Sequence, residues 1–153
     1  MVQRREARQL VIQAVYAEDL SGSDSNQLFN TIIKPHFSGD RKNYSFAERL
    51  FFQTVNHKDE LDQIIQNHIK NWRLGRLAVV DKIVLRVAIC EFLYFEEIPT
   101  KVTINEAIEI AKDYSTSNSG KFINGILDAA LERLQSEGKI QKKGRGLIES
   151  SIN

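Results

Sequence analysis

Apolar residues recur at the three- and four-residue spacing of an α-helix through most of this chain of 153 residues. Glycine and proline, the residues that most often interrupt helices, number only eight and two. This is about half of their usual combined share. The pattern predicts long helices joined by few connections, and it disfavours strand-rich folds. We therefore predict an all-α fold with about seven helices.

The expected helices are located by their apolar stripes. They cover residues 3–19, a short stretch at 28–33 that ends near Pro35, residues 44–70 with a break near 57–60, residues 83–95, a helix opened by Thr103, and residues 118–135. Residues 83–95 are apolar on nearly all sides, which places them at the centre of the core, with a buried strand as the alternative. Thr103 and Glu106 have the spacing of a capping box. Gly125 lies inside the last helix, where we expect another backbone to approach closely.

Composition and the N-terminus restrict the class of protein. The chain is 42% hydrophobic and 27% charged, which is typical of a soluble globular protein that buries a core of its own. Its first residues are charged where a signal peptide is apolar. Its longest apolar stretch is shorter than the roughly 20 residues that cross a bilayer. We expect a cytoplasmic protein with no membrane segment.

No pattern typical of an enzyme is present in the sequence. His36, His57 and His68 are widely separated, so no zinc site is predicted. Glycine-rich nucleotide-binding and phosphate-binding motifs are absent, as is a serine nucleophile motif. The single cysteine, Cys90, allows no internal disulfide and lies in the most apolar segment, which is typical of a buried hydrophobe. We predict that the chain is not an enzyme and uses no cofactor or metal.

Positive charge gathers at the two ends of the chain, although the net charge is only +1. Residues 1–17 carry +2 and residues 138–153 carry +3. Basic ends on a mildly acidic body can hold an anionic ligand locally. For residues 138–153, which show no apolar period, the alternative is a frayed basic tail that only favours solubility.

Arginines and one tyrosine share a side of the first predicted helix. At about 100° per residue, one arc lies about 110° from the apolar stripe. It holds Arg4, Arg5, Arg8, Ile12 and Tyr16. Guanidinium groups bind phosphates and a tyrosine ring can stack on an unpaired base, a mixture that suits single-stranded RNA. The alternative is that Ile12 and Tyr16 pack against a neighbouring helix while the arginines face water.

A second candidate anion site lies where the last helix begins. It comprises Ser117, Asn118, Ser119, Gly120 and Lys121. Free amides at a helix start together with a lysine attract phosphate. Polar residues at this position are also what any helix N-cap needs, so a purely structural role is the alternative.

Four sequence blocks, in order, resemble the NusB family of bacterial transcription antitermination factors. They are Arg4-Arg5-x-Ala7-Arg8 with Gln13-Ala14-Val15-Tyr16, Asp81-Lys82-x-x-Leu85-Arg86-x-Ala88, Val102-x-Ile104-Asn105-Glu106-Ala107 with Ala111-Lys112, and Lys121-Phe122-Ile123-Asn124-Gly125-Ile126-Leu127-Asp128. The resemblance implies a single helical domain over residues 1–137, made of two small bundles. Their expected ranges are about 1–74 and 75–137, with the central buried helix near 82–96 and a basic, flexible tail over 138–153.

The resemblance also implies a function. Proteins of this family pair with NusE, a small-subunit ribosomal protein, and the pair binds boxA RNA so that the transcription elongation complex reads through terminators in ribosomal RNA operons. The RNA-binding residues implied here are Arg4, Arg5, Arg8, Tyr16, Lys121 and Phe122, and the residue implied for NusE is Asp81. Glu6 departs from the family pattern, because relatives often carry a basic residue there.

Two other functions remain compatible with the sequence. NusB-like domains precede the catalytic part of some RNA cytosine methyltransferases, so the chain fits a stand-alone accessory module of such an enzyme. It also fits a helical bundle that binds only proteins, in which the arginines are merely solvated.

Overall fold

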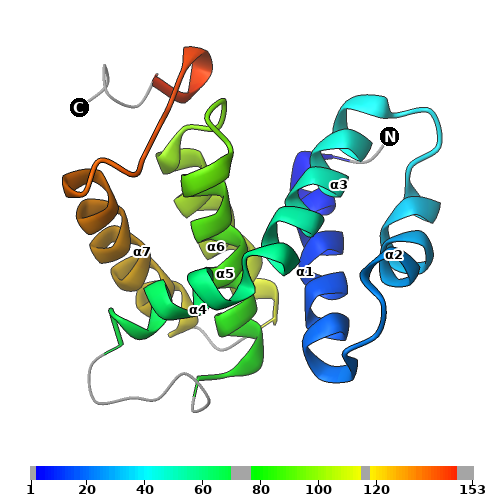
Figure 1. Cartoon of the computed structure of the whole chain (residues 1–153), viewed down its shortest axis with the longest axis horizontal. Coiled ribbons are helices and arrows are strands. Elements are labelled where there is room, and N and C mark those ends of the chain that lie inside the picture. The colour runs from blue at the N-terminus through cyan, green and yellow to red at the C-terminus, as the bar shows by residue number, and fades with distance from the viewer. Residues whose placement is uncertain (1–2, 70–76, 115–117, 148–153) are drawn as a thin grey trace. The chain divides into compact units, whose positions relative to one another are not determined.

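The structure, a computed structural model, describes residues 3–69, 77–114 and 118–147. Within these ranges the chain forms helices and no strand, which confirms the all-α prediction (Figure 1). The chain divides into two compact units, residues 1–58 and 59–153. This division comes earlier than the expected boundary near residue 74, because the helix that starts at Lys58 belongs almost entirely to the second unit.

The first unit is built on two long helices that pack against each other along their apolar stripes. They are α1 (Arg4–Ser21) and α3 (Arg41–Asn56). A short helical stretch joins them, made of α2 (Ser25–Leu28), the π-helical turn η1 (Phe29–Ile33) and the 3-10 turn η2 (Lys34–His36). Phe29 of η1 is buried against α3, with its ring centroid 5.6 Å from that of Tyr44 and 5.4 Å from that of Phe52.

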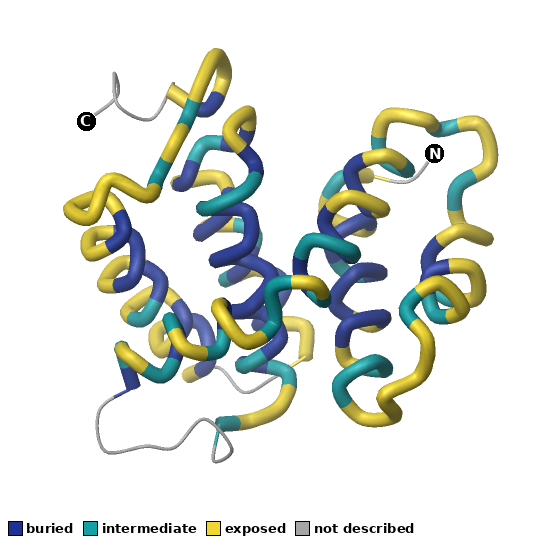
Figure 2. The backbone as a smooth tube through the Cα atoms, in the orientation of Figure 1, coloured by how far each residue is buried: buried dark blue, intermediate teal, exposed yellow. Residues whose placement is uncertain are grey.

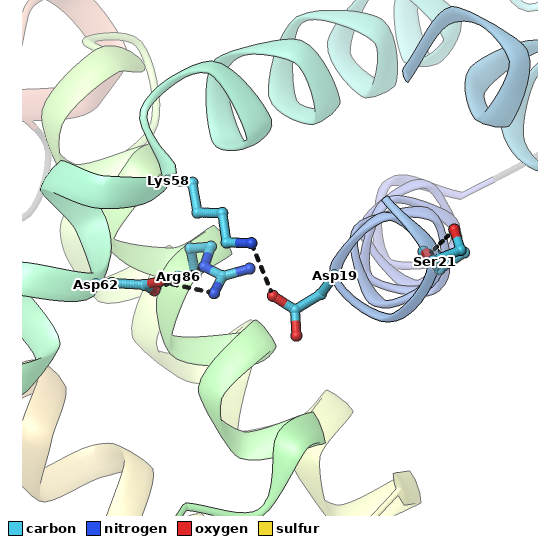
Figure 3. Close-up of polar contacts among 6 residues, drawn as sticks. Asp19, Ser21, Lys58, Asp62 and Arg86 are labelled. Carbon is cyan, nitrogen blue, oxygen red and sulfur yellow. Dashed lines mark hydrogen bonds and ion pairs between the residues drawn. The ribbon is translucent and has the colours of Figure 1, made fainter. Parts of the chain in front are cut away.

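Local signals set where these helices begin and end. Gly22 follows α1 with φ 67°, a left-handed conformation that glycine adopts without strain. Asp40 caps α3 by accepting a hydrogen bond from the backbone N–H of Asn43, with Oδ1 and N 3.2 Å apart. An ion pair between Lys58 Nζ and Asp19 Oδ1, 3.2 Å apart, joins the residue two positions after α3 to the last turn of α1 (Figure 3).

The second unit is arranged around α5 (Val79–Tyr94), which is buried along most of its length (Figure 2). This confirms the central helix, and the alternative of a buried strand is wrong. Two helices, α6 (Thr100–Tyr114) and α7 (Ser119–Ser136), pack against α5 and against each other. The described part of this unit also contains α4 (Lys58–Gln66) and the 3-10 turn η4 (Gly144–Leu147). The break between α3 and α4 falls at His57, within the predicted interval.

A charged pair joins α4 to the apolar helix α5. The Arg86 side chain is 1% exposed, and its Nε and Nη2 donate hydrogen bonds to the two carboxylate oxygens of Asp62 at 2.8 and 3.0 Å (Figure 3). This two-bond geometry is the strongest pairing that a guanidinium group makes with a carboxylate. It explains how the most buried helix of the unit accommodates an arginine.

The predicted capping box at Thr103 is wrong. Helix α6 begins at Thr100, directly after Pro99, so Thr103 lies inside the helix. The Thr103 hydroxyl instead donates a hydrogen bond to Glu91 Oε1 of α5, at 2.9 Å. Glu91 is itself buried, and a buried carboxylate requires such a donor. Tertiary packing therefore uses the hydroxyl that the sequence pattern assigned to the helix end.

The basic segment after α7 is docked on the second unit as far as Leu147. The Lys142 ammonium donates hydrogen bonds to the carbonyl oxygens of Glu91 and Phe95, at 3.1 and 2.7 Å, at the end of α5, where the helix dipole favours a cation. Gly146 is buried, and a Cβ there would collide with the carbonyl oxygen of Glu96. The expectation of a frayed tail is therefore wrong for residues 139–147, and residues 148–153 lie outside the described ranges.

Candidate nucleic-acid interface

Two arginines at the start of α1 are held against one aromatic ring of α3. The guanidinium carbon of Arg4 lies 4.0 Å from the ring centroid of Phe46, and that of Arg8 lies 5.1 Å from it. Arg4 Nε also donates a hydrogen bond to Asn43 Oδ1 at 2.9 Å. A cation above an aromatic face is attracted by the negative charge of the ring face. These contacts fix where the positive charge lies at the start of α1.

The predicted solvent-facing arc of α1 is only partly exposed. Arg5 is exposed and Tyr16 is 38% exposed, whereas Arg4 is half-buried. Arg8 and Ile12 are only 3% and 5% exposed, so the alternative of packing within the chain holds for Ile12 but not for Tyr16, and Arg8 does not face water. Helical spacing gives the direction of a side chain on an isolated helix, but neighbouring side chains decide whether that direction is covered.

The exposed side of α1 extends beyond the residues that the sequence singled out. Leu20, one turn after Tyr16, is 63% exposed, and Gln13, one turn before Tyr16, is exposed as well. Residues three or four positions apart lie on the same side of a helix. The tyrosine ring is thus one part of an exposed row rather than an isolated contact. The spacing of Tyr16 and Leu20 is the sequence signal that could have revealed it.

At the start of α7, buried and exposed residues follow one another directly. Ser119 and Gly120 are buried, while Lys121 is exposed and Phe122 is 36% exposed. A Cβ on Gly120 would lie 3.4 Å from Ile108 Cγ2, so this glycine is packed against α6. Ser117, which completes the predicted anion site, lies outside the described residues.

Asp81 is buried, with 8% of its surface exposed. It lies in the first turn of α5, and its Oδ2 accepts a hydrogen bond from the Ser119 hydroxyl of α7 at 3.3 Å. The structure therefore brings Asp81 together with the start of α7, which carries Lys121 and Phe122. Arg4, Arg5, Arg8 and Tyr16 belong to the first unit, and these three belong to the second.

The expected close backbone approach at Gly125 is wrong. Gly125 is exposed, and in the described part of the chain a Cβ there would meet nothing within 4 Å. The glycine instead leaves this side of α7 without a side chain, one turn after Phe122. Its cost to the helix, about 1 kcal/mol relative to alanine, is not explained by packing within the described chain.

None of the candidate residues lines a cavity found in the described part of the second unit. That cavity, of about 460 Å³, is lined by residues of α4, the end of α5 and residues 138–141. Tyr94 lines it and donates a hydrogen bond to Glu60 Oε1 at 2.5 Å, and burial together with this carboxylate raises the pKa of Tyr94. Over the described ranges, no group of three His, Cys, Asp or Glu residues is placed to hold a metal. No helix in those ranges is both long and apolar enough to cross a membrane.

Comparison with known proteins gives a consistent result along the chain. The model of the NusB family matches residues 5–132. The transcription antitermination protein NusB of Salinibacter ruber is 43% identical over 148 residues, which cover 97% of this chain and 92% of that protein. The NusB of Chloroherpeton thalassium is 40% identical over 97% of this chain and 71% of its own length. Both relatives are transcription antitermination proteins, and membership of this family confirms the prediction that the chain is not an enzyme.

Solved structures show the same fold. NusB of T. maritima superimposes with a TM-score of 0.79 at 39% identity, covering 86% of this chain and 92% of that one. A NusB chain crystallised with NusE and double-stranded RNA superimposes with a TM-score of 0.77 at 26% identity, covering 85% and 96%. Family model, relatives and structures thus agree over nearly the whole described chain, and we conclude that it belongs to the NusB family of transcription antitermination proteins.

Proposed function

We propose that the chain is an RNA-binding antitermination factor that works in the cytoplasm with NusE. Its target would be boxA-type single-stranded RNA of ribosomal RNA operons, bound as part of the transcription elongation complex. The observation that carries the proposal is the likeness to a NusB chain solved with NusE and RNA, which this chain matches over 96% of that chain's length. The RNA in that structure is double-stranded, so the single-stranded preference rests on the residues described next.

The start of α1 supplies a phosphate contact and a stacking surface. Arg5 is exposed and would bind phosphate, and the exposed ring of Tyr16 would carry an unpaired base. Arg4 and Arg8 would add positive charge from fixed positions, because both lie over the ring of Phe46. Prearranged charge favours binding, since less side-chain freedom is lost when the ligand arrives.

The start of α7 supplies a second contact. Lys121 is exposed and would meet phosphate, and the Phe122 ring, 36% exposed, offers another face for a base. NusE would dock near Asp81, at the start of α5, where Val79 is 36% exposed. A few phosphate contacts give modest affinity by themselves. A partner that binds the same RNA raises the overall affinity without any change in chemistry.

The test is a binding titration with a boxA-type single-stranded RNA at several salt concentrations, with and without NusE. Replacing Arg5 and Arg8 together by alanine should weaken binding and flatten the salt dependence. Each lost phosphate contact lowers the slope of log K against log salt by about 0.7 for a single strand. Of the two single variants, Arg5→Ala should account for most of the change in slope, because Arg8 is only 3% exposed.

Glu132→Ala is a suitable control, because Glu132 is exposed on α7 two turns or more from Lys121. It should leave the salt slope unchanged. An unchanged titration for the Arg5 and Arg8 double variant would remove α1 from the interface. If the chain retains neither single-stranded nor duplex RNA even with NusE present, the result would instead support a bundle that binds only proteins.

A further inference from the structure

The Asp81 carboxylate lies where the first turns of two helices meet. It belongs to the first turn of α5 and accepts a hydrogen bond from Ser119, the first residue of α7, 38 positions further along the chain. Asp81 and Ser119 are 8% and 6% exposed. A carboxylate this well covered has little surface left for another molecule, so its hydrogen bond within the chain is its more direct contribution.

The electrostatics of the two helices favour a negative charge at this place. The start of a helix carries a partial positive charge from its unpaired amide groups. Asn118, the residue before α7, makes no side-chain capping hydrogen bond to that helix. The Ser119 hydroxyl thus connects the start of α7 to a buried carboxylate in the first turn of α5.

The next residue of α7 is held from a second direction. Gly120 is buried against α6, and a Cβ added to it would lie 3.4 Å from Ile108 Cγ2. Two successive residues therefore fix the start of α7, one to α5 and one to α6. The following two, Lys121 and Phe122, are the exposed ones. Their direction depends on how the first turn of α7 is held.

We infer that Asp81 is a positioning residue for RNA binding. Through the Ser119 hydroxyl it holds the first turn of α7 so that Lys121 and Phe122 face the RNA backbone and an unpaired base. This inference rests on the proposed function, and it gives Asp81 a role in the chain alone, before NusE is bound. If Asp81 contributed only by touching NusE, its replacement would not change RNA binding by the isolated chain.

The experiment measures binding of a boxA-type single-stranded RNA to the full chain without NusE. Asp81→Ala and Ser119→Ala should each weaken binding about three- to tenfold, the range expected for one lost hydrogen bond. The double variant should bind RNA no more weakly than Asp81→Ala alone, because Ser119→Ala removes a bond that Asp81→Ala has already removed. Asp81→Asn keeps an acceptor oxygen toward Ser119 and should retain more affinity than Asp81→Ala.

A background variant separates positioning from general loss of stability. In a chain that already carries Lys121→Ala and Phe122→Ala, Asp81→Ala should cause no further loss of RNA affinity. Asp128→Ala, which removes an exposed acid of α7, is the matched control and should not weaken binding. All titrations are run well below the melting temperature of each variant, and Ser119→Ala, which removes a single oxygen atom, serves if Asp81→Ala does not fold.

The outcomes distinguish the inference from the proposed function. If Lys121→Ala with Phe122→Ala weakens RNA binding and both Asp81→Ala and Ser119→Ala do not, the inference is overturned and the RNA contact at α7 stands. If Asp81→Ala still weakens binding in the background variant, the effect does not pass through these two residues and the inference is also overturned. If Lys121→Ala with Phe122→Ala changes nothing, the proposed contact at α7 fails together with the inference.

Discussion

Arg8 in the first unit and Arg86 in the second are buried to almost the same extent but are held in different ways. Arg86, 1% exposed, donates two hydrogen bonds to the carboxylate of Asp62. Arg8, 3% exposed, lies over the ring of Phe46, which it shares with Arg4. The carboxylate meets the edge of the Arg86 guanidinium group through two hydrogen bonds, whereas the aromatic ring contacts the Arg8 guanidinium group through its face. Equal burial therefore does not mean an equal role.

The largest effect expected from this comparison is on the Arg86 pair. Asp62→Ala would remove two charge-assisted hydrogen bonds from a guanidinium group that is 1% exposed, so we expect the free energy of unfolding to fall by about 3 kcal/mol. Urea denaturation followed by circular dichroism measures it. Lys58→Met is the matched control, because it removes the ion pair with Asp19 from a side chain that is 37% exposed, and it should cost less than about 1 kcal/mol.

Replacing both members of the pair tests whether the penalty comes from the unpaired charge. Asp62→Leu combined with Arg86→Met should recover most of the stability that Asp62→Ala loses. A double variant as unstable as the single one would show that the two arginines do not differ in the way described, and that packing around α4 dominates instead.

The Phe46 ring should have a smaller effect on stability. Phe46→Leu removes the face under Arg4 and Arg8 while keeping an apolar side chain, and we expect a loss of about 1–2 kcal/mol. Phe46→Tyr keeps the aromatic face and is the control, with stability close to that of the unchanged chain. Thermal denaturation of both variants measures the difference. Equal losses in the leucine and tyrosine variants would mean that the ring holds the arginines by shape alone.

Lys142, in the docked segment after α7, adds a third case to the comparison, because carbonyl groups hold its ammonium group. Lys142→Met should lower the free energy of unfolding by about 1 kcal/mol, because hydrogen bonds to the carbonyls of Glu91 and Phe95 are lost. Lys143→Met is the control: its side chain is 76% exposed and its ion pair with Glu96 is long, at 3.9 Å. Amide hydrogen exchange at the end of α5 should speed up only in the Lys142 variant.

The smallest expected effect on stability concerns His68, whose protonated, positively charged form is disfavoured in the folded chain. Burial and the positive charge of Arg133 lower the pKa of His68 below its ordinary value of 6.5. Protonation therefore favours the unfolded chain, so stability is complete above about pH 6.5 and declines as the pH falls toward the lowered native pKa. His68→Gln should reduce this decline in denaturation curves measured between pH 7 and pH 5. A decline of equal size in the variant would assign the effect to other groups.

Helical periodicity predicted the existence and kind of the main helices. The stripes of α1, α3, α4 and α7 and the apolar character of α5 were sufficient, because burial of one face is the main requirement that the fold places on each helix. The break near His57 was predicted from the change of phase in the stripe. Family blocks in the sequence also indicated the NusB family, which the comparisons confirm.

Predictions about single polar residues were less successful. Thr103 bonds to Glu91 rather than capping its own helix, and Lys142 closes the end of α5 rather than lying in a frayed tail. Both residues find their partners 12 or more positions away in the chain. Sequence spacing describes only local hydrogen bonds, and a buried partner on another helix can outcompete them.

The amino-acid sequence by itself determined the helical architecture, the family, and which residues carry positive charge and aromatic rings near the two helix starts. Tertiary structure alone decided which of them reach solvent: Arg8 is covered while Tyr16 is exposed, and Asp81 faces Ser119. The physical reason is that helix formation and burial of an apolar face follow from regular local spacing. Exposure of a particular side chain depends on the neighbours that packing brings from distant parts of the chain.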